Sequence, residues 1–312
     1  MKRARMHQAE GNFDRARKPL SDREFLLFQK LIYRAAGIYL SKAKKALVEG
    51  RLSRRVRELE MASFSAYYEY LSSEKSGAEL SEMLDRIATN ETRFFREARQ
   101  FAFLEQQVFP EWQAQAMRVA RSKRIRVWSA GCSTGEEPYS IAMILLDHFP
   151  AQTGWQIEIL ATDLSRRALR AARAAVWPID NAKQIPPKYL KQFMLRGTGA
   201  QAGTMKAAAE LTALVRFEQV NLNDRVPPWL EHFDLIFCRN VLIYFDARSR
   251  ARVIHRLVDT LVPEGYLLVG HAESLTGITE HLQYAMPTVY QRAASQPSAH
   301  VGTLPWEASS ET

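Results

Sequence analysis

The sequence predicts an α/β protein in which a mostly parallel sheet follows a compact helical region. From residue 125 onward, short apolar strands alternate with helical segments, and the strands fall at 125–130, 157–162, 215–220, 234–238 and 266–270, with a last one at 288–293. This alternation is typical of a parallel sheet with helices on both faces. Before residue 125, apolar side chains recur at helical spacing. With 312 residues, 46% of them hydrophobic, the chain can bury cores in about two domains.

Changes in residue pattern divide the chain into segments. Prolines at 178, 186 and 187 and the sequence RGTG at 196–199 interrupt the strand–helix order, and a small subdomain inserted at about 177–214 accounts for this interruption. Both ends of the chain are polar or biased in composition, as disordered segments are. The predicted divisions are a disordered basic arm (1–19), a helical domain (20–90), a linker segment and helix (91–124), a sheet domain (125–293) and a disordered tail (294–312).

The helical domain has a clear starting signal. Ser21 and Glu24 have the spacing of a capping box and predict a helix over 22–36, which Gly37 ends. Ser41 is expected to cap a second helix that ends at about Glu60. Four basic side chains lie within about a quarter-turn of one another on it, and they form either a docking surface for an acidic partner or an ordinary solvated face. They are Lys44, Arg51, Arg54 and Arg55.

Composition excludes several classes of protein. No apolar run approaches the ~20 residues that cross a bilayer, and the basic N-terminal segment lacks the apolar stretch of a secretory signal. Cys132 and Cys238 have no CxxC spacing, and the seven histidines form no metal-ligand pattern. We therefore expect a cytoplasmic monomer without membrane insertion and without a bound metal. The net charge of +9 favours an acidic partner, which composition leaves open among nucleic acid, anionic membrane and acidic protein.

The sequence SAGCSTGEEPYS (129–140) directly follows a predicted strand and opens a helix. Gly131 and Gly135 allow a tight turn and a close approach of backbone to a ligand. Such loops at the carboxyl ends of parallel strands bind nucleotide-like ligands. The segment is neither GxGxxG nor GxxxxGK[ST], which disfavours a pyrophosphate ligand. A plain strand-to-helix turn is the alternative.

Polar side chains follow two other strands at the same predicted edge. Asp163 ends one strand and either accepts hydrogen bonds from ribose hydroxyls or caps the following helix. Arg239 and Asn240 end another within FDLIFCRNVLIYFD (233–246), from which Tyr244 could reach a ligand. These residues form either part of a ligand site or a simple strand-end turn.

The segment TNETRFFRE (89–97) lies between the helical region and the sheet domain. Its adjacent phenylalanines indicate docking against an apolar surface, and Arg93 and Arg96 could serve a carboxylate. An interdomain contact without a ligand is the alternative.

Taken together, these motifs resemble the CheR family of chemotaxis-receptor glutamate O-methyltransferases. TNETRFFRE, RVWSAGCSTGEEPYSIA, ATDLS, VNL, FDLIFCRNVLIYFD and GYLLVGHAES occur in order, and the similarity extends from about Leu20 to Arg292. The resemblance implies a Rossmann-like, S-adenosylmethionine-dependent methyltransferase domain behind an all-helical domain, with a small antiparallel β subdomain inserted. It also implies that cytoplasmic methylation helices of chemoreceptors are the substrate, met by the basic face above. In some members the inserted subdomain grips a peptide at the receptor's C-terminus.

The resemblance also implies site residues. Arg96 and Tyr244 would lie nearest the transferred methyl group and the incoming glutamate. The cofactor, S-adenosyl-L-methionine (product S-adenosyl-L-homocysteine), would contact Asn90, Thr92, Arg96, Gly131, Glu137, Asp163, Asn221, Leu222, Asn240 and Val241.

Three other functions are compatible with an α/β fold that binds a nucleotide-like cofactor. A nucleic-acid methyltransferase would use its positive charge to bind phosphates. The sequence lacks an aromatic-rich platform for single strands, so we expect no nucleic-acid partner. A nicotinamide-dependent oxidoreductase is disfavoured by the missing GxGxxG. A non-catalytic module that keeps the ligand as a regulator is the third alternative.

Overall fold

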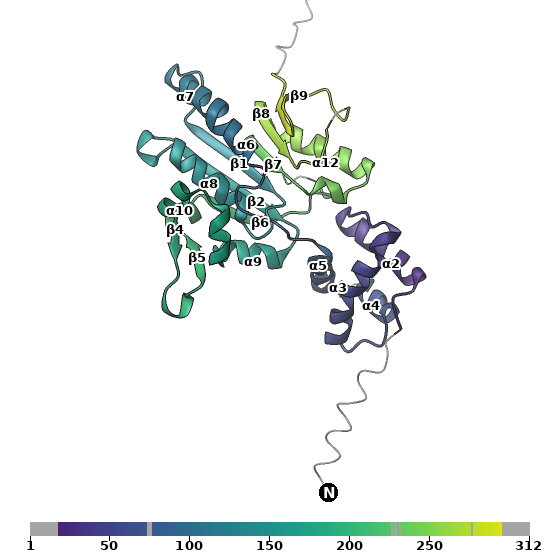
Figure 1. Ribbon diagram of the computed structural model, residues 1–312. Coiled ribbons are helices and arrows are strands. Elements are labelled where there is room, and N and C mark those ends of the chain that lie inside the picture. Colours follow the sequence, from purple (N-terminus) through teal and green to yellow (C-terminus); the bar gives the residue numbers. More distant parts are fainter. Residues whose placement is uncertain are drawn as a thin grey trace, which may run out of the picture.

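The computed structural model describes residues 18–73, 77–225, 227, 230, 232–275 and 277–294. The predicted arm (1–19) and tail (294–312) lie outside the described residues, apart from Lys18, Pro19 and Ala294. The described chain forms a helical domain beside a larger sheet domain, from which a small second sheet projects (Figure 1).

The helical domain begins as its capping box predicts. The Ser21 side chain accepts a hydrogen bond from Glu24 N, the Glu24 side chain bonds the Ser21 backbone, and Gly37 ends the helix with φ +71°. The second helix is shorter than predicted, because Ser41 makes no side-chain cap and a 3₁₀ turn precedes the α-helix. The elements are α2 (Asp22–Ala36), η1 (Lys42–Lys44), α3 (Lys45–Glu58), α4 (Phe64–Leu71) and α5 (Gly77–Ile87). Their apolar faces share one core around Phe28, Leu52 and Tyr67.

The predicted linker helix is present as a continuous segment with a wider central turn. Its parts are α6 (Ala98–Phe103), the π-helical η2 (Leu104–Val108) and α7 (Phe109–Met117). Such π turns interrupt the regular hydrogen-bond ladder of a helix. The buried side chains Phe101, Leu104 and Phe109 pack this segment onto the main sheet.

The main sheet has seven strands in the order β6-β2-β1-β7-β8-β10-β9. Strands β6 to β8 of this order run parallel, and β10 runs antiparallel to both of its neighbours. The predicted parallel sheet is therefore confirmed, whereas β9 was not predicted. The strands are β1 (Arg124–Ala130), β2 (Gln156–Asp163), β6 (Val215–Gln219), β7 (Phe233–Cys238), β8 (Leu261–Val269), β9 (Leu282–Met286) and β10 (Val289–Arg292).

Helices cover both faces of this sheet. Helices α8 (Glu136–His148) and α9 (Arg166–Ala174) pack with the linker helix in one core, and α12 (Ala247–Thr260) packs in a second core on the opposite face. Alternate residues of β7 divide between the two cores, as Phe237 enters the first and Ile236 the second. Short 3₁₀ turns follow at η3 (Ala151–Thr153) and η6 (Leu242–Tyr244). None of the helices in the described ranges is long and apolar enough to cross a membrane.

A small antiparallel sheet of order β3-β5-β4 lies between α9 and β6, as the interruption in the sequence predicts. In Figure 1 it projects below α8 with helix α10 beside it. Its elements are β3 (Val176–Pro178), η4 (Ile179–Gln184), α10 (Pro187–Phe193), β4 (Met194–Arg196), η5 (Gly199–Gln201), β5 (Thr204–Ala207) and α11 (Ala209–Thr212).

Candidate functional site

A cavity of about 300 Å³ lies between the helical domain and the carboxyl edge of the main sheet. Asp163 lines it as the last residue of β2, and Gly131, Val220 and Arg239 line it directly after the ends of β1, β6 and β7. Strand β1 is flanked by β2 on one side and by β7 on the other. Later strands are therefore added on opposite sides of β1, which makes its end the point where the strand order reverses. Open α/β sheets bind ligands at such a switch point.

Most of the predicted site residues meet in this cavity. Arg54 and Arg55 do not line it. Those that do are Asn90, Thr92, Arg96, Gly131, Glu137, Asp163, Asn221, Leu222, Asn240, Val241 and Tyr244, together with Lys44 and Arg51 from the helical domain.

The glycine loop keeps its backbone close to the opposite wall. Gly131 has φ +88°, a conformation that L side chains rarely adopt, and its N–H donates to Thr162 O over 2.7 Å. A Cβ at this position would lie 2.3 Å from Val241 Cγ2. Only glycine therefore leaves this side of the cavity open.

The Asp163 carboxylate accepts main-chain hydrogen bonds beside the loop. Oδ2 accepts from Ser133 N and Oδ1 from Ser165 N, each over 2.8 Å. Burial raises the pKa of Asp163, although these two N–H groups act in the opposite direction. The alternative role as helix cap is wrong, because Ser165 is the N-cap of α9 and its side chain accepts from Ala168 N. The Asp163 carboxylate therefore lines the cavity without capping that helix.

Asn240 lines the cavity and carries a buried side-chain oxygen without a partner in the described chain. Its backbone has φ +59°, and its Oδ1 is buried without a hydrogen-bond partner among the described residues. The turn is held by buried Glu273, which accepts from the N–H groups of Asn240 (2.8 Å), Gly270 (2.6 Å) and Ile243 (3.2 Å). Sequence reasoning missed Glu273, because its role depends on main-chain contacts with residues that lie 30 and 33 positions earlier in the chain.

Two buried side chains of opposite charge, Glu137 and Arg239, line the cavity. Glu137 accepts from Ser129 Oγ over 2.6 Å and from Arg239 Nε over 2.7 Å. Arg239 also donates to the main-chain carbonyl of Arg96 and to Gln100 Oε1. Sequence reasoning placed Arg239 only as a polar strand end, whereas the structure shows that it fixes the backbone of Arg96.

The segment at 89–97 docks on the small sheet and on α8. Phe94 packs edge-on against Trp177 at 5.0 Å between ring centroids, and Phe95 N donates to Ser140 Oγ over 3.0 Å. Phe95 and Glu97 both have positive φ, at 50° and 61°. Such strain is found where the surroundings impose a conformation, and here it turns the intervening Arg96 toward the cavity that it lines.

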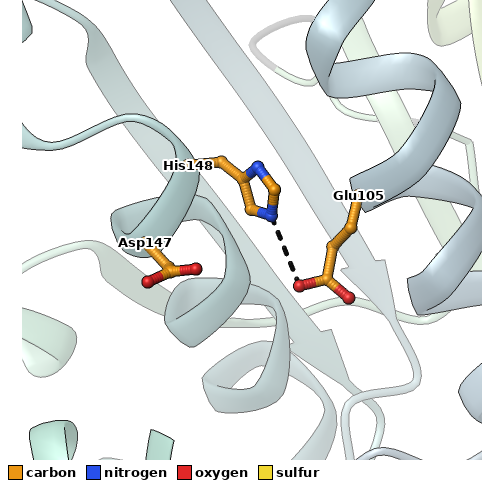
Figure 2. Close-up of side chains that lie close together, drawn as sticks. All are labelled: Glu105, Asp147 and His148. Atoms are coloured by element: carbon orange, nitrogen blue, oxygen red, sulfur yellow. Dashed lines mark hydrogen bonds and ion pairs between the residues drawn. The ribbon is translucent and has the colours of Figure 1, made fainter. Parts of the chain in front are cut away.

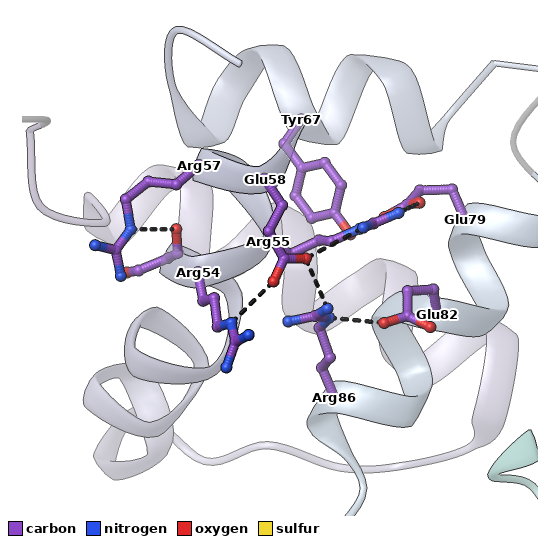
Figure 3. Close-up of polar contacts among 9 residues, drawn as sticks. Arg54, Arg55, Arg57, Glu58, Tyr67, Glu79, Glu82 and Arg86 are labelled. Carbon is purple, nitrogen blue, oxygen red and sulfur yellow. Dashed lines mark hydrogen bonds and ion pairs between the residues drawn. The ribbon is translucent and has the colours of Figure 1, made fainter. Parts of the chain in front are cut away.

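The four basic side chains of the second helical segment do not share one exposed face, which corrects the helical-wheel expectation. Arg51 donates to Ile87 O and to Thr89 Oγ1 at the cavity wall. Figure 3 shows that Arg55 instead pairs with Glu79 of α5, through Nε (2.9 Å) and Nη2 (2.6 Å). Lys44 and Arg54 are the exposed members of the set, and Arg51 and Arg55 are half-buried.

A group of possible metal ligands lies in the η2–α8 contact, away from the cavity. One ligand atom from each of Glu105, Asp147 and His148 falls within 4.8 Å of the others (Figure 2). Their own partners account for the grouping, since Glu105 accepts from Tyr189 Oη and lies 3.4 Å from His148 Nε2, while Asp147 pairs with Lys188. The His148 contact, with others, lowers the pKa of Glu105. We read the cluster as a packing contact between helices.

The cavity fits an adenosine-type cofactor through features already described. The Asn240 oxygen lacks a partner, the Gly131 backbone leaves space that a Cβ would fill, and Asp163 can accept further hydrogen bonds. Residues 90–290, which include the seven-stranded sheet, match the family model "CheR methyltransferase, SAM binding domain". The fold and the site define an S-adenosylmethionine-dependent methyltransferase.

Residues 23–88 match the model "CheR methyltransferase, all-alpha domain". The chain belongs to the CheR methyltransferase family. It is 38% identical over 264 residues to "Chemotaxis protein methyltransferase" of Borreliella burgdorferi, covering 84% of this chain and 92% of that one. It is 37% identical over 270 residues to "Chemotaxis protein methyltransferase 2" of Pseudomonas aeruginosa (86% and 93%) and 37% identical over 275 residues to the Escherichia coli "Chemotaxis protein methyltransferase" (88% and 92%).

Proposed function

We propose that this enzyme transfers a methyl group from S-adenosylmethionine to glutamate side chains of bacterial chemoreceptors, giving glutamate methyl esters and S-adenosylhomocysteine. The observation that carries the proposal is a group of three cations, Lys44, Arg51 and Arg96, that lines the interdomain cavity together with Tyr244. Cationic side chains there favour a carboxylate substrate. The relatives named as chemotaxis methyltransferases support the same assignment.

Cofactor binding is assigned to the sheet side of the cavity. Asp163 would accept hydrogen bonds from ribose hydroxyls, and Asn240 Oδ1 would receive a donor that it otherwise lacks. The cofactor supplies a methyl group activated by a positively charged sulfur. The remaining contacts proposed for it are Asn90, Thr92, Arg96, Gly131, Glu137, Asn221, Leu222 and Val241.

The Asn221 side chain is already engaged in hydrogen bonds within the protein, which limits its contact with the cofactor. Its Nδ2 donates to Ala35 O over 2.7 Å, and its Oδ1 accepts from Asn223 N over 3.1 Å. The side chain thus ties the helical domain to the sheet. We expect its contribution to the cofactor site to be mainly that of holding the neighbouring wall in place.

The reaction needs little acid–base help from the protein. A glutamate carboxylate is already ionised near neutral pH, and the described residues that line the cavity include neither histidine nor cysteine. Glu137 and Asp163 already accept hydrogen bonds from the protein, and Asp163 keeps lone pairs for the ribose hydroxyls. Charge is lost as carboxylate and sulfonium react, so catalysis rests on holding the two groups close and aligned.

Arg96 and Tyr244 are the residues proposed for this alignment. The Arg96 guanidinium makes one side-chain hydrogen bond within the described chain, to Glu91 O over 3.3 Å, and keeps donors for a carboxylate of substrate or cofactor. Its backbone is fixed by Arg239. Tyr244 follows the Asn240 turn and shapes the channel for the methyl group.

Receptor binding is assigned to the helical domain. Lys44 and Arg51 at the cavity and exposed Arg54 beside it would attract the acidic methylation helices. The Arg55–Glu79 pair would serve the stability of the domain instead. The small antiparallel sheet is proposed as a site for a receptor C-terminal peptide.

The substrate class can be tested by offering alternatives together. Purified enzyme, methyl-labelled S-adenosylmethionine, membranes bearing unmethylated chemoreceptors, RNA and DNA are incubated, and the labelled fraction is identified. The proposal expects label in the receptor alone, and loss of that label with Arg96→Ala. Label in nucleic acid, or no label while S-adenosylhomocysteine still binds tightly, would overturn the substrate assignment. An unchanged rate and unchanged affinities in Arg96→Ala would remove Arg96 from the site.

A further inference from the structure

Two large apolar side chains remain exposed where they line the cavity. Tyr39 is 55% exposed and comes from the helical domain, and Ile243 is 48% exposed and comes from the turn after β7. Single exposed apolar residues are common on protein surfaces. These two differ because they belong to the same cavity and come from opposite domains.

The backbone holds both residues in place. Tyr39 N donates to Tyr244 O over 2.8 Å, next to an antiparallel bridge between Ile38 and Phe245. Ile243 N donates to Glu273 Oε1 over 3.2 Å. The main chain of Tyr39 is therefore fixed across the domain boundary, and that of Ile243 is fixed within the sheet domain. Such preorganisation lowers the ordering cost of contacts with a partner.

The charge around them identifies the partner's chemistry. Lys44, Arg51 and Arg96 line the same cavity. A surface that combines cations with exposed apolar side chains complements a segment that carries carboxylates beside apolar residues. On a helix, side chains three or four positions from a glutamate lie about 5–6 Å from it. An acidic amphipathic helix can thus insert its glutamate and place neighbours one turn away at the rim.

We infer that Tyr39 and Ile243 determine specificity by contacting apolar side chains one helical turn from the target glutamate on an acidic amphipathic receptor helix. The inference rests on the proposed function and deepens it, since it names the sequence context that the enzyme prefers. The cations attract the helix, and the apolar pair selects which glutamate enters.

Side-chain truncation separates this role from a structural one. Tyr39→Ala and Ile243→Ala keep the main-chain N–H groups that hold the rim. Loss of the apolar contact is expected to raise KM for receptor about ten-fold, with kcat changed less than about two-fold and the Kd of S-adenosylhomocysteine unchanged. Tyr39→Phe keeps the ring and should retain the wild-type KM. Tyr70→Ala is the matched control, because Tyr70 is 39% exposed on α4 and does not line the cavity.

Salt distinguishes apolar from ionic contacts. The ratio of variant to wild-type KM should persist at high salt for Tyr39→Ala, but should shrink for Lys44→Ala because salt screens exposed charges.

A matched change in the substrate completes the test. Receptor variants in which apolar residues one turn from a methylated glutamate become serine should lose activity with wild-type enzyme, and lose little more with the Tyr39→Ala, Ile243→Ala double variant. Additive losses, or a wild-type KM in the enzyme variants, would overturn the inference alone. No receptor methylation by the wild-type enzyme would instead overturn the proposed function and the inference with it.

Discussion

Arg239 Nε donates to Glu137 Oε2 over 2.7 Å, and the two side chains are only 2% and 9% exposed. The pair joins β1 to the 89–97 segment, because Ser129 donates to Glu137 and Arg239 donates to the carbonyl of Arg96. Removing one partner of a buried ion pair strongly destabilises a protein, because the remaining charge is buried without compensation.

We therefore expect Glu137→Gln to lower the free energy of unfolding of the ligand-free protein by about 3–5 kcal/mol. Urea unfolding followed by circular dichroism measures the change. The control is Arg54→Ala, which breaks an ion pair whose arginine side chain is 78% exposed and should alter stability little. Equal effects of the two variants would contradict the structural role assigned to the buried pair.

Gly131→Ala should damage cofactor binding beyond the cost of backbone strain. A Cβ would lie 2.3 Å from Val241 Cγ2, so the wall must move, and the Kd of S-adenosylhomocysteine should rise at least about ten-fold. Gly154→Ala is a matched control, because Gly154 has φ +78° and nothing within 4 Å of its would-be Cβ. Both variants share a strain of about 1–2 kcal/mol. Calorimetric titration that gives both variants wild-type affinity would exclude the close approach at Gly131.

Asn240→Gly removes the unpaired oxygen without forcing the backbone, which has φ +59°. Because Oδ1 has no partner in the described part of the chain, its loss should change the stability of the ligand-free protein by less than about 1 kcal/mol. The same substitution should weaken S-adenosylhomocysteine binding about ten-fold or more, since a ligand donor loses its acceptor. Titration and thermal unfolding of the same samples separate the two effects. Large destabilisation with unchanged affinity would reverse the assignment.

Affinity for S-adenosylhomocysteine should fall on acidification, starting above pH 3.8, the ordinary pKa of aspartate. Burial raises the pKa of Asp163 in the ligand-free protein, so the carboxyl binds its proton at a higher pH than usual. Ribose hydroxyls would donate to the ionised form, and binding must then expel the proton. Affinity is therefore full above the raised pKa and is lost as pH falls through it.

Titrations from about pH 5 to 8 test this dependence, with circular dichroism to show that the protein stays folded. Asp163→Asn should bind S-adenosylhomocysteine weakly, and its affinity should not fall further on acidification. The same fall in affinity in both proteins would assign the pH dependence to another group.

Local signals in the sequence predicted much of the fold. The Ser21–Glu24 capping box and Gly37 define the first helix as observed, and strand–helix alternation predicted that the main sheet is mostly parallel. Strand β9 was missed because it lies at the sheet edge, where its side chains are half-buried or exposed and show no alternation. Ser41 was a misleading signal, since a 3₁₀ turn intervenes before α3.

Gly131, Asp163 and Asn240 line the cavity, and the sequence could place them there because each stands at the end of a predicted strand. Glu273 and Gln100 were beyond sequence reasoning, because each acts through contacts with distant chain segments. Gln100 donates to Val269 O and to Thr288 Oγ1, which its own helix does not reveal. The same holds for Arg55, whose partner Glu79 lies on another helix. Such pairings are set by tertiary packing, which periodicity does not encode.

The bond formed on the receptor tests the central claim most directly. Receptor membranes are incubated with enzyme and methyl-labelled S-adenosylmethionine, the receptor band is isolated and treated with alkali, and volatile label is measured. A glutamate methyl ester predicts that alkali releases the label as methanol, and that wild-type enzyme gives this label while Arg96→Ala gives little. Label that stays on the receptor after alkali would show methylation of another group and would contradict the account.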